Sequence, residues 1–203
     1  MEKHDLWLFN GPMVGDITPG SAKFWVRTAG TSEVQIEITG SELSSDIITT
    51  SAVDYFTAVL PVEGLEPFTE YRYTVTVDGA VIDKPAFQFR TAPEPSQKVV
   101  FDVNSGPGSR YVPSNEHAWS TMAKQRPLAY LGLGDNVYIN VTEHRGGQRL
   151  FYYRHYLSPA YAELVAGTAI YAVWEQSGRT AMGNPARGLR RRTSEVETTA
   201  GGT

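Results

Sequence analysis

Apolar and polar residues alternate in the N-terminal part of the chain. In Val34–Ile38 and again in Tyr71–Val77, every second residue is aliphatic or aromatic, and polar residues lie between them. A period of two places one face of a β-strand on a core and the other in water. Asp78–Gly79 follows the second run and is a strong hairpin signal. Short strands at this spacing predict a β-sandwich over residues 6–91.

The segment Leu65–Tyr71 has the sequence of a tyrosine corner, a motif of immunoglobulin-like and fibronectin type III sandwiches. In that motif a tyrosine hydroxyl bonds to the backbone a few residues upstream. We expect Tyr71 to make this bond. The alternative is an ordinary strand tyrosine that faces outward.

The pattern changes after a short proline-containing segment. Pro93 and Pro95 disfavour both a helix and a central strand at this point. We therefore expect a sandwich domain over residues 1–93, a linker at 94–97 and a second domain over 98–174.

The second domain is expected to alternate strands and helices. Helical segments are predicted for Ser114–Gln125, for Gln148–Leu157, and from Pro159 to a C-terminal cap at Gly167. Buried strands are predicted before, between and after them, at Val99–Val103, Leu128–Leu133 and Thr168–Trp174. This order predicts a parallel sheet with right-handed crossovers.

Residues 175–203 differ from both domains. They contain several glycines, the basic run Arg190–Arg192 and few large apolar side chains, without periodicity. Such a segment cannot bury enough apolar surface to offset its ordering entropy, so it is predicted to be disordered.

Composition excludes several classes of function. The chain has 203 residues, 41% of them hydrophobic and 20% charged, as in an ordinary globular protein. A net charge of -4 argues against broad nucleic-acid binding. Without cysteine there is no disulfide, thiol nucleophile or zinc–thiolate site. No apolar run reaches the length of a membrane span, and the first residues lack the apolar centre of a signal peptide.

Candidate chemistry lies where the predicted strands end, because open α/β sheets bind ligands beyond the carboxyl ends of their strands. Gly134–Asp135 follows the second strand, and a carboxylate there could reach a metal ion, with Tyr138 as a second ligand. The alternative is that Asp135 starts a turn and Tyr138 packs. Arg110 and Asn136 are candidates for substrate binding.

A run of aromatic residues, Phe151–Tyr153 with Tyr156, recurs at helical spacing. This favours packing in a core over a stacking platform.

The chain resembles the alkaline phosphatase D (PhoD-like) family of metallophosphatases. The similar segments are Gly11–Thr18, Ser21–Thr28, Gly64–Tyr73, Phe89–Pro93, Leu131–Tyr138 and Ala169–Trp174. The resemblance implies an immunoglobulin/fibronectin III-like β-sandwich followed by a calcineurin-like metallophosphatase α/β domain, that is, a multidomain β then α/β chain. It also implies an enzyme that hydrolyses small phosphate esters with iron and calcium, and a periplasmic or secreted location. Asp135 would bridge two metals, and Tyr138 would bind the iron.

Two departures from the family pattern put the site in doubt. The family's Ser-Cys pair, whose cysteine is a metal ligand, is Ser105–Gly106 here. The family's Asp-Asp-His block after the third strand is replaced by Glu175–Ser177, and the later ligand strands are absent. We therefore expect an incomplete α/β domain, a chain truncated or frameshifted after Trp174, and impaired activity. The alternative is a non-catalytic sandwich that binds a partner and carries a vestigial α/β remnant. The oligomeric state stays open.

Overall fold

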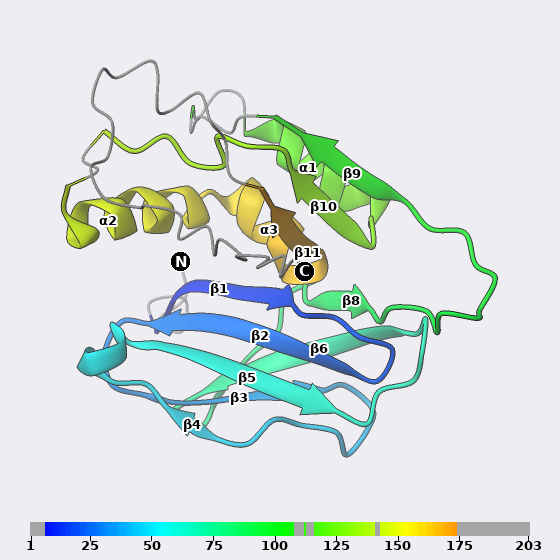
Figure 1. The fold of residues 1–203 in the computed structure, drawn as a ribbon. Helices are drawn as coiled ribbons and strands as arrows, with labels where there is room; N and C mark the ends of the chain where they lie inside the picture. The colour runs from blue at the N-terminus through cyan, green and yellow to red at the C-terminus, as the bar shows by residue number, and fades with distance from the viewer. Residues whose placement is uncertain (1–6, 108–111, 113–115, 141–142, 174–203) are drawn as a thin grey trace, which may run out of the picture.

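The structure is a computed structural model and describes residues 7–107, 112, 116–140 and 143–173. A β-sandwich forms one side of the molecule, and a layer of helices with a small sheet lies over it (Figure 1). Four sequence predictions fall outside the described residues. They concern the start of the predicted helix at Ser114, the candidate substrate-binding residue Arg110, Trp174 at the end of the third strand, and the segment 175–203.

The sandwich consists of two antiparallel sheets. In the first, β2 (Ser21–Thr28) lies between β1 (Leu8–Gly15) and β5 (Thr57–Glu63). The second sheet consists of β3 (Glu33–Ile38), β4 (Ile48–Thr49), β6 (Glu70–Val77), β7 (Ala80–Ile82) and β8 (Gln88–Arg90). Its strand order is β4-β3-β6-β7, and β8 also pairs with β6. A short 3-10 helix, Ala52–Asp54, precedes β5. The predicted β-sandwich is confirmed.

The alternating pattern places the apolar side chains between the two sheets. Phe24, Leu60, Tyr73 and Val75 are fully buried there. Phe24 contacts the ring of Tyr73 at a centroid distance of 4.7 Å. This core holds the sheets together, because each buried aliphatic or aromatic side chain contributes about 1.5–3 kcal/mol.

Two local predictions in the sandwich are confirmed. Asp78 and Gly79 both have positive φ, at 47° and 77°, which is the geometry of a two-residue hairpin turn between β6 and β7. The hydroxyl of Tyr71 accepts a hydrogen bond of 2.8 Å from the backbone N–H of Glu66. Tyr71 therefore makes the tyrosine corner.

The second part contains a parallel three-stranded sheet in the order β11-β10-β9. Its strands are β9 (Val103–Gly106), β10 (Ala129–Gly132) and β11 (Ala169–Ala172), and its helices are α1 (His117–Gln125), α2 (Arg145–Tyr156) and α3 (Pro159–Gly167). The predicted alternation of strands and helices and the parallel pairing are confirmed.

The first strand of this sheet was predicted in the wrong place. Val99–Asp102 is not a strand, and Val100 is 92% exposed, although the run is rich in β-branched residues. The ladder begins where Val103 lies opposite Ala129, and within the part of the chain that the structure describes β9 pairs with β10 alone. The register with β10 therefore decides where the strand begins, and local β-propensity does not.

The role predicted for Gly167 was also wrong. Gly167 is the last residue of α3, and the extended Thr168 is the C-terminal cap. A Cβ on Gly167 would lie closer than 3.0 Å to the backbone oxygen of Gln88 in β8. Glycine is present here because the helix approaches the sandwich backbone closely, and not because a left-handed cap requires it.

Helix α3 joins the two parts. Its Ala166 belongs to the buried cluster of the sandwich, and the Tyr73 hydroxyl donates a buried hydrogen bond of 2.7 Å to the carbonyl oxygen of Ala166. Its other face, with Leu164 and Val165, packs with Trp119 of α1 in the second core.

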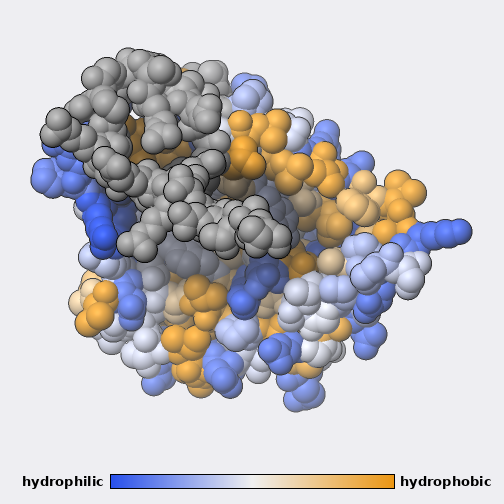
Figure 2. Space-filling model, viewed as in Figure 1, coloured by the Kyte–Doolittle hydropathy of each residue, from blue (hydrophilic) through white to orange (hydrophobic). Residues whose placement is uncertain are grey.

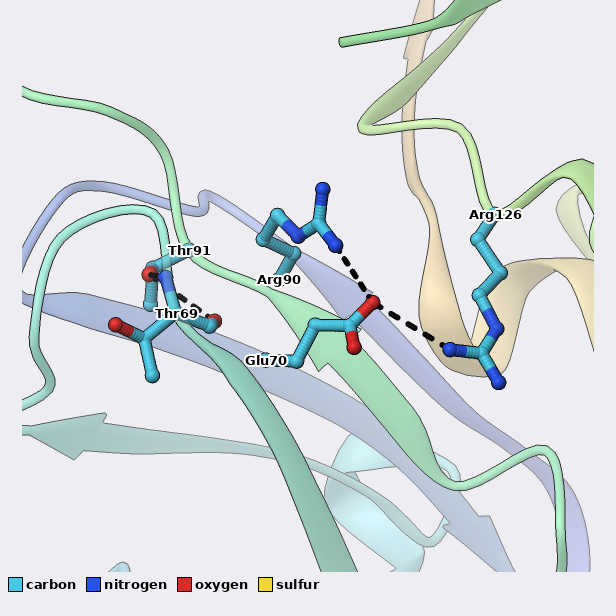
Figure 3. Close-up of polar contacts among 5 residues, drawn as sticks. All are labelled: Thr69, Glu70, Arg90, Thr91 and Arg126. Carbon is cyan, nitrogen blue, oxygen red and sulfur yellow. Dashed lines mark hydrogen bonds and ion pairs between the residues drawn. The ribbon is translucent and has the colours of Figure 1, made fainter. Parts of the chain in front are cut away.

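An ionic cluster crosses the same junction (Figure 3). One carboxylate oxygen of Glu70 accepts from Arg90 at 2.8 Å and lies 3.5 Å from a guanidinium nitrogen of Arg126, which precedes β10. All three side chains are at least 38% exposed. Exposed ion pairs contribute about 0–1 kcal/mol, so the apolar packing of α3 determines how the two parts are held.

One face of the parallel sheet carries exposed apolar residues. Val103, Leu131 and Tyr171 alternate with the residues that face α1 and α3, and they are 44%, 38% and 48% exposed. Apolar surface gathers over β9 and β10 at the upper right of Figure 2. Parallel sheets are usually covered on both faces. The described residues cover only one face here.

Candidate functional site

The carboxyl ends of the three parallel strands lie at one edge of the sheet. Gly106, Gly132 and Ala172 are paired across β9, β10 and β11. Backbone hydrogen bonds continue past them, from Leu133 N–H to Gly106 O at 3.0 Å and from Val173 N–H to Gly132 O at 2.9 Å. The segments that follow the strands therefore begin side by side, where an open α/β sheet binds its ligands.

The Gly134–Asp135 turn lies at this edge. Gly134 has a φ of 112° and is buried, and Asp135 has a φ of 45° and is half-buried. Glycine adopts such a backbone without cost, and aspartate tolerates the left-handed region better than most residues. The turn follows β10 directly, so Asp135 stands just beyond the carboxyl end of that strand.

Asn136 fixes this turn to the neighbouring strand end. Its Nδ2 donates a hydrogen bond of 3.2 Å to the carbonyl oxygen of Val173. Its Oδ1 lies against Gly132, so close that a Cβ at that position would overlap it. The structure thus gives Asn136 a positioning role beside the predicted substrate-binding one.

The described residues do not make a complete metal centre. No group of three His, Asp or Glu side chains that could hold a metal ion occurs in the part of the chain that the structure describes. Tyr138 is 45% exposed and lies on the segment after the turn. At Gly106, the position of the family's cysteine ligand, a Cβ would lie 2.9 Å from the Tyr130 hydroxyl. The donors Asp135 and Tyr138 therefore do not by themselves fit a two-metal site.

A cavity that the sequence did not reveal opens beside this edge. Its volume is about 230 Å³, somewhat below the range of about 300–1,000 Å³ that drug-sized ligand sites have. Its lining combines residues at or just after the strand ends with aromatic side chains of β10 and the helices: Gly106, Gly134, Asn136, Trp119, Tyr130, Tyr152, Tyr156 and Tyr161. The helical spacing of Phe151–Tyr153 and Tyr156 indicated a core; Tyr156 packs partly buried against the second core, whereas Tyr152 is 39% exposed.

Burial favours the uncharged forms of four titratable groups that line this cavity, since it shifts the pKa values of Tyr130, His155, Tyr156 and Tyr161. It raises the pKa of Tyr156 to about 12, and it raises the pKa values of Tyr130 and Tyr161. It lowers the pKa of His155, against the attraction of the Glu116 carboxylate and together with the repulsion of Arg154. The cavity therefore presents neutral aromatic surface.

The lowered pKa of His155 predicts a loss of stability in acid. The unfolded chain binds the imidazole proton near the ordinary pKa of about 6.5, whereas the folded chain binds it only at lower pH. The contribution of the neutral His155 side chain to the free energy of unfolding is therefore fully present above about pH 6.5, and it is lost as the pH falls toward the folded-state pKa. Urea unfolding between about pH 7.5 and pH 5.5 is expected to show a smaller pH dependence for His155→Gln than for the unchanged chain.

The matched control is His144→Gln, because His144 is exposed. Its pH dependence should equal that of the unchanged chain. Equal slopes for all three proteins would contradict the assignment of the effect to His155.

The comparisons with known proteins concern first the sandwich and then the whole fold. A domain family described as a domain of unknown function (DUF7800) matches residues 5–94. No curated protein matches the chain. The solved structure of PhoD is similar with a TM-score of 0.72 over 87% of this chain, at 16% sequence identity. The fold resembles that of PhoD.

A second solved structure is also similar in fold to this chain. The purple acid phosphatase PPD1 from yellow lupin (Lupinus luteus) seeds is similar with a TM-score of 0.54 over 81% of this chain, at 13% identity. The chain spans 40% of the length of PhoD and 34% of that of the lupin enzyme. Both likenesses include the sandwich and the α/β layer over it, because each covers far more than residues 5–94.

Among the described residues, no helix is both long enough and apolar enough to cross a membrane.

Proposed function

We propose that this chain takes part in the metal-dependent hydrolysis of phosphate esters, as an immunoglobulin/fibronectin III-like sandwich joined to the first strands of a calcineurin-like metallophosphatase domain. The observation that carries the proposal is the Gly134–Asp135 turn at the carboxyl edge of a parallel sheet, in a chain whose fold resembles PhoD and a purple acid phosphatase. The proposed domains are residues 1–93 and 98–174, with a linker at 94–97.

The proposed role of Asp135 follows from its carboxylate and its position. A carboxylate at a strand end can bind a metal ion that polarises a phosphate oxygen and activates water. Tyr138 is the proposed second ligand, and Asn136 and Arg110 are proposed to contact a small phosphate-ester substrate. Iron and calcium are the proposed metals. Further ligands would have to come from outside the described residues, and the proposed periplasmic or secreted location belongs to the same resemblance.

Metal content after loading tests this proposal. We expect the purified chain to retain metal after incubation with iron and calcium and desalting. The Asp135→Asn variant should retain at least about tenfold less metal at the same free metal concentration. Even residues that only hydrogen-bond to a metal ligand change metal affinity by about 10–100-fold, so the loss of a ligand should have an effect at least this large. Elemental analysis measures the metal, and hydrolysis of 4-nitrophenyl phosphate and of bis(4-nitrophenyl) phosphate measures any activity on monoesters and diesters.

Asp102→Asn is the matched control. Asp102 is exposed and directly precedes β9, so it lies at the opposite, amino-terminal edge of the sheet. It should leave metal retention unchanged. A folded chain that retains no metal, or equal losses in the two variants, would contradict the proposal.

A non-catalytic role is the second candidate, since the described residues contain no group of three potential ligands of the His, Asp or Glu type. In that case the sandwich binds a partner and the α/β layer is a remnant. A folded, metal-free chain would favour this role.

A further inference from the structure

Two neighbouring cavities share part of an aromatic lining. The first, of about 230 Å³, opens at the strand ends, and the second, of about 320 Å³, lies between α2 and the sandwich. Met13, Tyr152 and Tyr156 line both. We call these two adjoining cavities together the aromatic groove.

The inner end of the aromatic groove reaches the candidate site. Gly134, Asn136 and Val137, which surround Asp135 in the sequence, form part of its wall. Trp119 and Tyr161 line the same cavity, and their rings meet edge to face with centroids 5.0 Å apart. A molecule in the inner cavity would therefore have one end beside the turn that carries Asp135.

The outer end is open and is shared between the two parts of the protein. Trp25 of β2 contacts Tyr153 and Tyr156 of α2, with ring centroids 6.4 Å and 5.8 Å apart. Arg149 also lines this end, but its guanidinium lies 3.5 Å from the centre of the Tyr55 ring. The cation is thus engaged on an aromatic face, and aromatic carbon forms most of the surface.

The size and charge of the inner cavity suit one neutral ring. A cavity of about 150 Å³ is enough to bind benzene, so about 230 Å³ holds a single six-membered or fused ring. Tyrosine and tryptophan rings bind other aromatic rings by stacking or edge-to-face contact. Burial favours the uncharged forms of titratable groups that line the cavity, and it likewise disfavours a charged ligand group inside it.

We propose that the aromatic groove binds the aromatic ring of a phosphate ester, with the ester's phosphoryl group directed to the Asp135 turn. The substrate class is thus an aryl or base-bearing phosphate ester rather than a simple alkyl one. The inference rests on the proposed hydrolase function for the phosphoryl part, whereas ring binding by the groove is tested separately.

The test uses three probes on the whole chain, observed by ligand NMR and titration: phenol, phenylphosphonate and methylphosphonate. We expect phenol and phenylphosphonate to bind, and methylphosphonate to bind at least about tenfold more weakly than phenylphosphonate, since one stacked ring contributes a factor of about 5–100 in affinity. Tyr152→Ala should weaken the two aromatic probes by about 5–100-fold, because it removes a ring shared by both cavities.

Tyr171→Ala is the matched control. Tyr171 is 48% exposed, compared with 39% for Tyr152, and lies on the sheet face that carries Val103 and Leu131, away from the groove. It should leave all three affinities unchanged. Thermal unfolding of both variants shows whether either substitution has disturbed the fold.

The outcomes separate the two proposals. Phenol binding that is lost in Tyr152→Ala supports the groove even if the chain retains no metal, in which case only the hydrolase function fails. Equal affinity for phenylphosphonate and methylphosphonate, or equal effects of Tyr152→Ala and Tyr171→Ala, would overturn the inference even in a chain that binds metal.

Discussion

Replacing Leu164 by alanine is expected to lower the free energy of unfolding by about 2–5 kcal/mol. Leu164 is fully buried in α3 and packs in one cluster with Trp119, Tyr130, Tyr161 and Val165. Truncation removes apolar contacts and leaves a cavity, because the surrounding rings are large and rigid and cannot fill the space. This helix also carries Ala166 into the sandwich core, so the loss should affect both parts.

Urea unfolding followed by circular dichroism measures this change. The matched control is Leu150→Ala in α2, whose side chain is 64% exposed and which should change stability by less than about 0.5 kcal/mol. The prediction is wrong if the two leucine substitutions shift the unfolding midpoint equally. The same result would mean that α3 does not pack against α1 as the structure shows.

The sandwich could be predicted from the sequence because its signals are local. Strict alternation in Tyr71–Val77 is enough to assign one face to the core, and Asp78–Gly79 can adopt a turn that few other pairs allow. The tyrosine corner spans only Glu66 to Tyr71. Each of these features is decided within a few residues, so a single sequence contains the information.

The α/β part was predicted less accurately because its decisive contacts are distant in sequence. Val99–Asp102 has the composition of a strand but belongs to no ladder among the described residues, since the ladder with β10 begins only at Val103. The glycine at the end of α3 suggested a helix cap, whereas the reason for it is the backbone of β8. A sequence pattern records that a residue is small and does not record which segment approaches it.

The candidate site shows the same division. A buried strand followed by Gly134–Asp135 predicted an aspartate just beyond a strand end, and Asp135 does follow the end of β10. The bond from Asn136 to Val173 and the aromatic groove depend on how α2 and β11 pack beside β10, which periodicity does not specify. Whether Asp135 and Tyr138 bind metal stays a prediction.

Replacing Gly167 by alanine is expected to lower the free energy of unfolding by about 1–3 kcal/mol, although alanine is the better helix former. The new methyl group would lie closer than 3.0 Å to the carbonyl oxygen of Gln88, a backbone atom that cannot rotate away. Relief requires α3 to move from the sandwich, and this would disturb the hydrogen bond between Tyr73 and Ala166.

Gly146→Ala in α2 separates the clash from helix propensity. A Cβ at Gly146 has no neighbour within 4 Å, so this substitution should raise stability by up to about 1 kcal/mol. Urea unfolding of the two variants should therefore give shifts of opposite sign. If both substitutions stabilised the protein, α3 would not approach β8 closely. The two parts would then be joined less tightly than the hydrogen bond between Tyr73 and Ala166 indicates. Opposite signs would mean that the sandwich fixes the position of α3, and through it the helical side of the aromatic groove.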